Sequence, residues 1–263
     1  MFSRFSGKAV VITGGATGIG LACARAFVEG GAGVLIIGNQ AAPGRLALET
    51  LKDGPGQAAF FRGDVRKARQ MTAAFAQAES LYAGIDILVN NAGLNMVGHV
   101  DELNEAQWDL ALDTNLKGAF LASREAIPRM KRRGGGVIVN ISSNAGLVAR
   151  PQDPAYSASK AGLVMLTRSM ALAHAAERIR VNAVCPGPVS RTTIFEEYVQ
   201  RYSDPQAAVA GLMAAAPMAK ALGRLIVPDE VAAAVVYLCS DEAQMVTGAI
   251  LAVDGGKSAG GAG

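Results

Sequence analysis

The sequence predicts an α/β fold, a doubly wound parallel sheet of seven strands with helices on both faces, in one domain spanning residues 1–263. Short β-branched runs alternate with longer helical patterns along the chain. The runs are almost continuously apolar, as in parallel strands that are covered on both sides. With 51% hydrophobic and 18% charged residues, the chain can bury a large core.

The expected elements follow one another in regular order. Apolar runs predict strands at residues 9–12, 34–37, 58–61, 87–89, 137–141, 180–184 and 249–253. Helical patterns lie at residues 19–29, 43–52, 67–82, 105–132, 155–176 and 228–239. Residues 188–227 are the least regular, with two helix-like pieces around Asp204-Pro205, and the small residues at 258–263 are typical of a flexible tail.

Composition excludes several classes of partner. A net charge of +3 is too small to favour nucleic acid or a membrane surface. With 2 His and 3 Cys, we expect no metal site. Cys23, Cys185 and Cys239 form no C-x-x-C pair, and the N-terminus has no apolar signal-peptide core, so we expect a cytoplasmic protein with reduced thiols.

A glycine-rich turn follows the first expected strand. It reads Thr13-Gly14-Gly15-Ala16-Thr17-Gly18-Ile19-Gly20 and leads into a helix. Gly14 suits the tight turn, Gly18 lets the backbone approach a pyrophosphate, and Gly20 allows close helix–strand packing. Phosphates would lie on the helix N-terminus, where free N–H groups favour anions. This placement predicts a dinucleotide-binding Rossmann unit.

The end of the second strand bears on the choice between NAD and NADP. An acid there would bind the ribose of NAD, but the sequence reads Ile37-Gly38-Asn39-Gln40. Gly38 removes the charge that would repel a 2′-phosphate, although no adjacent Arg or Lys is present to bind one. Asn39 could hydrogen-bond either cofactor. Because no acid is present to repel the 2′-phosphate, we expect NADP and keep NAD as the alternative.

A tyrosine and a lysine supply candidate chemistry. Tyr156 and Lys160 lie one turn apart on an expected helix, where the ammonium would lower the pKa of the phenol. Ser142 and Ser143 end the fifth strand, at the sheet edge where open α/β sheets bind ligands. Taken singly, each of these residues also suits a turn or a surface helix.

Together these motifs resemble the short-chain dehydrogenase/reductase family over nearly the whole chain. Beside the glycine turn, the matching positions are Asp64-Val65, Asn90–Gly93, Asn115, Ser143, Tyr156, Lys160, Pro186-Gly187 and Asp254-Gly255-Gly256. The resemblance implies NAD(P)-dependent oxidoreduction of an alcohol or carbonyl compound. It also implies a small-molecule substrate and a homo-oligomer, commonly a tetramer.

The resemblance assigns roles to individual residues. Tyr156 would be the general acid/base, Lys160 would bind the nicotinamide ribose and depress the Tyr156 pKa, and Ser143 would polarise the substrate oxygen. Asn115 would hold a water in a proton relay toward Lys160. The remaining cofactor contacts would come from Gly14, Thr17, Gly18, Ile19, Asn39, Asp64, Val65, Asn91, Gly93, Pro186, Gly187 and Val189.

Two features leave parts of this picture open. Arg191 stands where the family often has a carboxamide-binding Thr, and Thr192 follows it. Residues 188–227 resemble the substrate-covering segment, with apolar candidates Ile194, Phe195, Tyr198, Leu212 and Met213, and Leu94, Met96, Val148 and Gln152 as further pocket candidates.

Three functions remain in view. The first interconverts a secondary alcohol and a ketone by hydride transfer. The second is a 3-oxoacyl-thioester reductase of fatty-acid synthesis, for which the cations Lys131-Arg132-Arg133 could bind a carrier's phosphopantetheine, although they also suit a helix C-terminus. The third is a non-catalytic dinucleotide sensor, against which the full set of catalytic residues argues.

Overall fold

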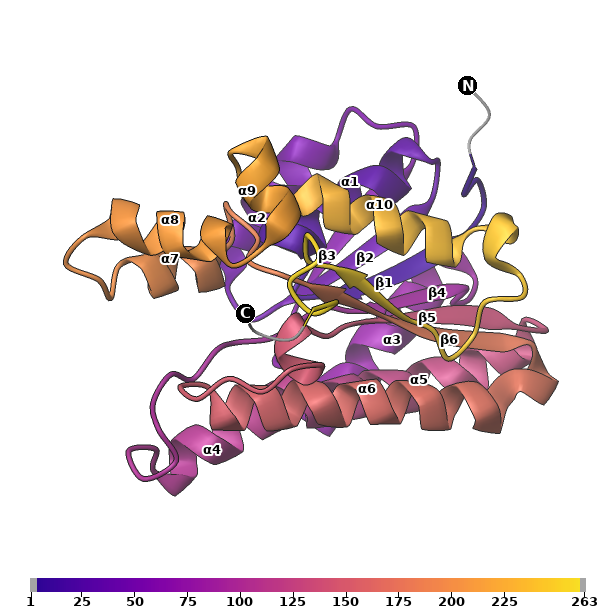
Figure 1. Ribbon diagram of the computed structural model, residues 1–263. Helices are drawn as coiled ribbons and strands as arrows, with labels where there is room; N and C mark the ends of the chain where they lie inside the picture. Colours follow the sequence, from indigo (N-terminus) through magenta and orange to yellow (C-terminus); the bar gives the residue numbers. More distant parts are fainter. Residues whose placement is uncertain (1–3, 261–263) are drawn as a thin grey trace.

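The computed structural model describes residues 4–260 and contains the expected parallel sheet (Figure 1). All pairings in it are parallel, in the order β3-β2-β1-β4-β5-β6-β7. The strands are β1 (Ala9–Thr13), β2 (Gly33–Gly38), β3 (Gln57–Arg62), β4 (Ile87–Asn90), β5 (Gly136–Ile141), β6 (Ile179–Pro186) and β7 (Ile250–Val253). The order changes direction between β1 and β4, the switch point of a doubly wound sheet.

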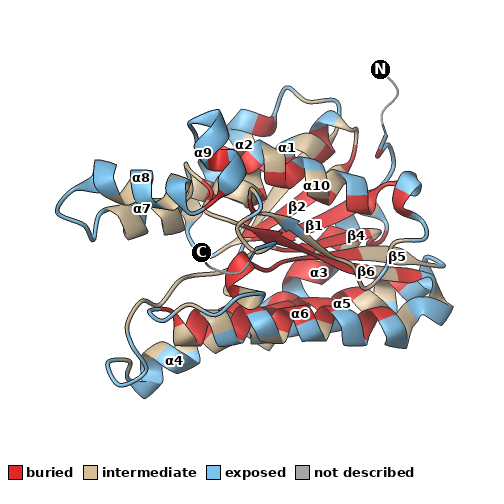
Figure 2. Ribbon diagram, in the orientation of Figure 1, coloured by how far each residue is buried: buried red, intermediate tan, exposed pale blue. Residues whose placement is uncertain are grey.

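Helices cover both faces of the sheet. They are α1 (Gly18–Glu29), α2 (Ala41–Leu51), α3 (Ala68–Tyr82), α4 (Glu105–Leu112), α5 (Gly118–Arg132), α6 (Pro154–His174), α7 (Thr193–Val199), α8 (Pro205–Ala214), α9 (Pro217–Leu222) and α10 (Pro228–Cys239). Helices α1, α2 and α10 pack on one face, and α3, α5 and α6 pack on the other (Figure 2).

The alternation of side chains along each central strand explains the two layers. Val10 and Ile12 of β1 point into the layer beneath α1 and α10, whereas Val11 points into the layer with α3. All three are fully buried. The continuous apolar runs therefore identify strands with two covered faces.

The expected helix at residues 105–132 is interrupted. Helices α4 and α5 are joined by a π-helical turn, Asp113–Lys117, which contains Asn115. A helical pattern of apolar residues does not distinguish this wider turn, because it inserts only one residue into the period.

The irregular segment contains three helices where the sequence predicts two. Helices α7, α8 and α9 extend beyond the sheet at the end where the strands finish (Figure 1). Helix α9 has only six residues, too few for a periodic pattern. The expected tail at 258–263 begins in ordered turns, since the Ser258 N–H donates to Asp254 at 2.8 Å, and residues 261–263 lie outside the described residues.

The three cysteines are buried and unpaired, as the sequence predicts. In the described part of the chain, no helix is long and apolar enough to cross a membrane.

Candidate active site

A cavity of about 1360 Å³ lies at the carboxyl ends of the strands. It runs from the glycine turn after β1 to the ends of β5 and β6 and is bordered by residues of α7 and α8. Every predicted site residue lines it except Asn115: Gly14, Thr17, Gly18, Ile19, Asn39, Asp64, Val65, Asn91, Gly93, Ser143, Tyr156, Lys160, Pro186, Gly187 and Val189. The sheet thus gathers in one place residues that are scattered through the sequence.

The glycine turn has the form that a pyrophosphate requires. Gly14 and Gly18 have φ angles of 63° and 52°, a left-handed conformation that favours glycine. A Cβ on Gly20 would lie 2.3 Å from the Gly14 carbonyl oxygen, so only glycine fits there. No side chain caps the start of α1 and its first turn holds no acid, which leaves its N–H groups available to an anion. The turn therefore fits a dinucleotide.

Asn91 holds this turn from the neighbouring strand. Its Nδ2 donates to the carbonyl oxygens of Thr13 and Gly14 at 3.1 and 2.9 Å. The Thr13 hydroxyl in turn accepts from the N–H groups of Asn91 and Ala92. Asn91 lines the cavity, but its amide is committed to positioning the phosphate turn.

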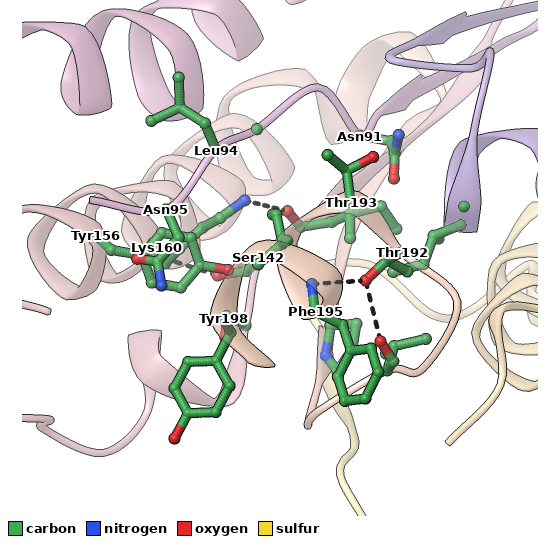
Figure 3. Close-up of a pocket in the computed structure, with 18 of the residues that line it drawn as sticks. Asn91, Leu94, Asn95, Ser142, Tyr156, Lys160, Thr192, Thr193, Phe195 and Tyr198 are labelled. Atoms are coloured by element: carbon green, nitrogen blue, oxygen red, sulfur yellow. Dashed lines mark hydrogen bonds between the residues drawn. The ribbon is translucent and has the colours of Figure 1, made fainter. Parts of the chain in front are cut away.

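Tyr156 and Lys160 lie together on α6, as their spacing predicts (Figure 3). Their exposed fractions are 8% and 3%. The Lys160 ammonium lies 5.7 Å from the centre of the Tyr156 ring and donates to the Ile141 carbonyl oxygen at 2.8 Å. Ser143, two residues after β5, also lines the cavity, and its hydroxyl lowers the pKa of the Tyr156 phenol. A phenol, a hydroxyl and an ammonium thus meet at one end of the cavity.

The electrostatics of the pair differ from the expectation. Burial raises the pKa of the Tyr156 phenol above its ordinary value, and Ser143 and Arg150 only partly oppose this rise. Burial also lowers the pKa of Lys160 from 10.5 to about 8. The net shift of the Tyr156 pKa is upward because desolvation dominates, and the role of Lys160 in lowering this pKa stays a prediction.

Asn115 does not line the cavity and contacts the loop that follows β4. Its Nδ2 donates to the Leu94 carbonyl oxygen and to Ser159 Oγ at 3.0 and 2.9 Å, and its Oδ1 accepts from the Leu94 N–H at 2.9 Å. These bonds occupy the side chain and fix the loop that carries Gly93. A role for Asn115 in a water relay stays a prediction.

Asp64 and Val65 border the far end of the cavity after β3. Arg66 donates to both Asp64 carboxylate oxygens, at 2.7 to 3.0 Å, and this pairing lowers the pKa of the Asp64 carboxyl. Val65 is buried against α5, where a Cβ on Gly118 would lie 2.8 Å from its Cγ2. The charge of Asp64 is thus already paired.

A cation lies beside the turn after β2, where the sequence indicates none. Arg62 pairs with Gly38 in the parallel register of β2 and β3, and its Nε donates to the Asn39 carbonyl oxygen at 3.4 Å. The expectation that no Arg or Lys lies near this turn is therefore wrong. Sequence proximity misses Arg62 because it is brought there by pairing between strands.

In the loop after β6, Thr192 and not Arg191 lines the cavity. Arg191 is exposed with a left-handed φ of 58° and does not line the cavity, whereas Thr192 does. The Thr192 hydroxyl donates to the Val189 carbonyl oxygen at 3.0 Å and accepts from the Phe195 N–H at 3.2 Å, capping α7 (Figure 3).

Most of the expected pocket residues border the cavity. They are Ile194, Phe195, Tyr198, Leu212, Leu94, Val148 and Gln152. Met96 and Met213 do not line it, and Met213 packs instead in a small apolar cluster with Ala216 and Leu225. Three cations that line the cavity, Arg66, Arg150 and Lys257, are missed by the sequence reasoning.

Comparison with known proteins agrees with this arrangement. The short chain dehydrogenase family model matches residues 8–203. The chain is 41% identical over 256 residues to an uncharacterized oxidoreductase of Thermotoga maritima, covering 97% of this chain and 99% of that one. It is 40% identical over 260 residues to 2-(S)-hydroxypropyl-CoM dehydrogenase 3 of Xanthobacter autotrophicus, covering 98% and 100%.

A solved structure is similar over the same extent. A protein of Burkholderia xenovorans described as a short-chain dehydrogenase/reductase superposes with a TM-score of 0.93 at 33% identity, covering 98% of this chain and 99% of that one. The chain belongs to the short-chain dehydrogenase/reductase family. It is an NAD(P)-dependent oxidoreductase that acts on alcohol and carbonyl groups.

Proposed function

We propose that the protein interconverts a secondary alcohol and a ketone, using NADP and Tyr156 as the general acid/base. The observation that carries this proposal is the meeting of Tyr156, Ser143 and Lys160 in the cavity that begins at the glycine turn. The nicotinamide cofactor, when bound, supplies the hydride or accepts it. Everything else in the reaction falls to side chains of this chain.

The cofactor-binding residues follow the length of the cavity. The N–H groups at the start of α1, around Gly18 and Ile19, would hold the pyrophosphate. Asp64 and Val65 would border the adenine, Asn91 and Gly93 the adenosine side, and Lys160 the nicotinamide ribose. Pro186, Gly187 and Val189 would line the nicotinamide, with Thr192 closing this end.

The raised pKa of Tyr156 fits it for carbonyl reduction. Because burial favours the neutral phenol, Tyr156 carries its proton at neutral pH. It donates that proton to the carbonyl oxygen as the carbon receives the hydride, leaving an alcohol and a tyrosinate. Oxidation reverses these steps: the tyrosinate takes the hydroxyl proton while the carbon loses the hydride. Ser143 orients the same oxygen by hydrogen bonding.

Lys160 supports the proton transfer as a positioning residue. A cation near the tyrosinate stabilises the charge that forms when Tyr156 loses its proton. The ammonium is held by the Ile141 carbonyl, and Asn115 fixes the loop across from it. A proton that leaves Tyr156 would be replaced through Lys160 and a water held by Asn115.

The choice of NADP rests on the turn after β2. Gly38 and Asn39 bring no negative charge, and Arg62 places a guanidinium next to Asn39. A 2′-phosphate would find a cation and no repelling carboxylate there. NAD lacks this phosphate and would gain nothing from Arg62.

A secondary alcohol is the substrate class that the relatives favour. One relative is named for a 2-(S)-hydroxypropyl group, whose hydroxyl is on a secondary carbon. The thioester reductase alternative gains no support from the cations at 131–133, because each is paired with an acid: Lys131 with Glu177, Arg132 with Glu79 and Arg133 with Asp86. The homotetramer and the cytoplasmic location stay predictions.

A panel of alcohols and ketones, each run with NAD(H) and NADP(H), tests the proposal. The expected result is turnover of secondary alcohols or ketones, faster at low concentrations of NADP(H) than of NAD(H). Turnover of primary alcohols alone, or a preference for NAD(H), would contradict it. If no pair reacts while either cofactor binds, the sensor hypothesis gains.

A further inference from the structure

Two cations in the substrate end of the cavity have no part in the mechanism above. Arg150 lies in the loop between β5 and α6, and Lys257 follows β7 near the end of the chain. Both line the same cavity as Tyr156, together with Tyr198 of α7. Burying a positive charge costs free energy unless the charge is paired with an anion.

Arg150 is held firmly in this position. Its Nη2 donates to Oδ1 of the fully buried Asn144, and its Nη1 lies 3.4 Å from the carboxylate of Asp153. Its charge reaches the phenols of Tyr156 and Tyr198, because it lowers the pKa of each. The contacts to Asn144 and Asp153 therefore fix the guanidinium at the wall of the cavity. Its side chain is still 28% exposed.

Of the two cations, Lys257 has fewer contacts with negatively charged or hydrogen-bonding groups. Within residues 4–260 its ammonium forms no ion pair and no side-chain hydrogen bond. Burial and the charge of Arg150 both lower its pKa, while Asp254 works in the other direction. The Asp254 carboxylate is itself occupied by the N–H groups of Gly256 and Ser258, at 3.0 and 2.8 Å.

The acids near these cations do not neutralise both of them. Asp153 is paired with Arg150, and Asp254 accepts from backbone groups. Glu197 also lines the cavity but is exposed at its rim and forms no ion pair among the described residues. The two cations repel one another across a partly desolvated space. An anion placed between them would relieve this repulsion and hydrogen-bond both.

We propose that Arg150 and Lys257 form a carboxylate subsite, so that the substrate is a hydroxy acid or the corresponding keto acid. The carboxylate binds at the two cations while the hydroxyl or carbonyl oxygen reaches Tyr156 and Ser143. The substrate is then held at both ends, with its reacting carbon between them. This inference rests on the proposed function, because it names the substrate class of that site.

The test compares acids with neutral analogues of the same shape. The matched pair is 3-hydroxybutyrate and 3-hydroxybutyramide, assayed with NADP, with their keto forms assayed with NADPH. We expect kcat/KM to be at least tenfold higher for the acid. Lys257→Met and Arg150→Gln should each reduce this acid-to-amide ratio at least tenfold, chiefly through the KM of the acid.

Lys220→Met is the control, because Lys220 is an exposed lysine of α9 that does not line the cavity. It should leave the acid-to-amide ratio unchanged. Calorimetric titration of butyrate and butyramide into the cofactor-bound protein gives a second readout, in which only butyrate binding should weaken in Lys257→Met.

The outcomes separate the two proposals. If the amide or an uncharged alcohol is the better substrate, and Lys257→Met leaves the ratio intact, the carboxylate subsite is wrong and the oxidoreductase proposal stands. If neither charged nor uncharged secondary alcohols react, the proposed function itself fails. Butyrate binding that is equal in wild type and Lys257→Met also overturns the subsite.

Discussion

Replacing Lys160 by methionine should stabilise the folded protein although it removes a group that we propose supports the proton transfer. Burial lowers the pKa of Lys160 from 10.5 to about 8. At about 1.4 kcal/mol per pKa unit, keeping this ammonium inside the fold costs about 3 kcal/mol at pH 7. Methionine fills a similar volume without charge. It leaves the Ile141 carbonyl without its donor, which costs about 1 kcal/mol, so the net gain is about 2 kcal/mol.

The pH dependence identifies the cause. Below pH 8 the lysine is protonated in both states, so the penalty is fully present. Between pH 8 and 10.5 the unfolded chain holds more protons, and wild-type stability rises with pH. At pH 10 only about 1 kcal/mol of the penalty remains, and the loss of the Ile141 hydrogen bond cancels it. The advantage of Lys160→Met should therefore vanish.

Urea unfolding without cofactor, followed by circular dichroism at one protein concentration, measures this at both pH values. Lys52→Met serves as the control, because Lys52 is exposed and pairs only with Glu49. Its stability should differ from wild type by less than about 0.5 kcal/mol at both pH values. The reasoning fails if Lys160→Met is less stable than wild type at pH 7, or if its advantage persists at pH 10.

Three further predictions concern the turn, the cofactor and the catalytic proton. Gly20→Ala should destabilise the protein by about 2 kcal/mol or more and weaken NADP binding, because its Cβ would lie 2.3 Å from the Gly14 carbonyl oxygen; thermal unfolding with and without NADP checks this. Gly38→Asp should raise the KM for NADP at least tenfold relative to NAD, through repulsion of the 2′-phosphate, and an unchanged ratio of the two KM values would refute the assigned position of that phosphate. Alcohol oxidation should accelerate as the pH rises into the alkaline range because the pKa of Tyr156 is raised, whereas carbonyl reduction should not require alkaline pH; an oxidation rate that levels off below pH 7 would contradict this.

The sequence predicts the sheet well because each strand is apolar on both faces. Strands β1 to β7 all lie within two residues of their expected bounds, and the glycine turn lies where β1 passes into α1. The π-helical turn at Asn115 and the short helix α9 escape prediction, because neither disturbs the hydrophobic period enough to be seen.

The candidate site is predictable where the chemistry is local. Tyr156 and Lys160 are one turn apart, so their proximity follows from helix geometry. Arg62 and Lys257 are different, because the pairing of β2 with β3 brings Arg62 next to Asn39, and the path of the chain after β7 brings Lys257 to the cavity. The direction of the Tyr156 pKa shift also escapes prediction, since burial outweighs the neighbouring ammonium.

The central claim is that Tyr156 transfers the proton, and Tyr156→Phe tests it most directly. The variant removes one hydroxyl from a buried ring and leaves the glycine turn untouched. NADPH binding is measured by fluorescence titration and turnover by the best ketone of the panel. We predict a loss of kcat of at least a thousandfold with a Kd for NADPH within threefold of wild type. Turnover near the wild-type rate would contradict the account.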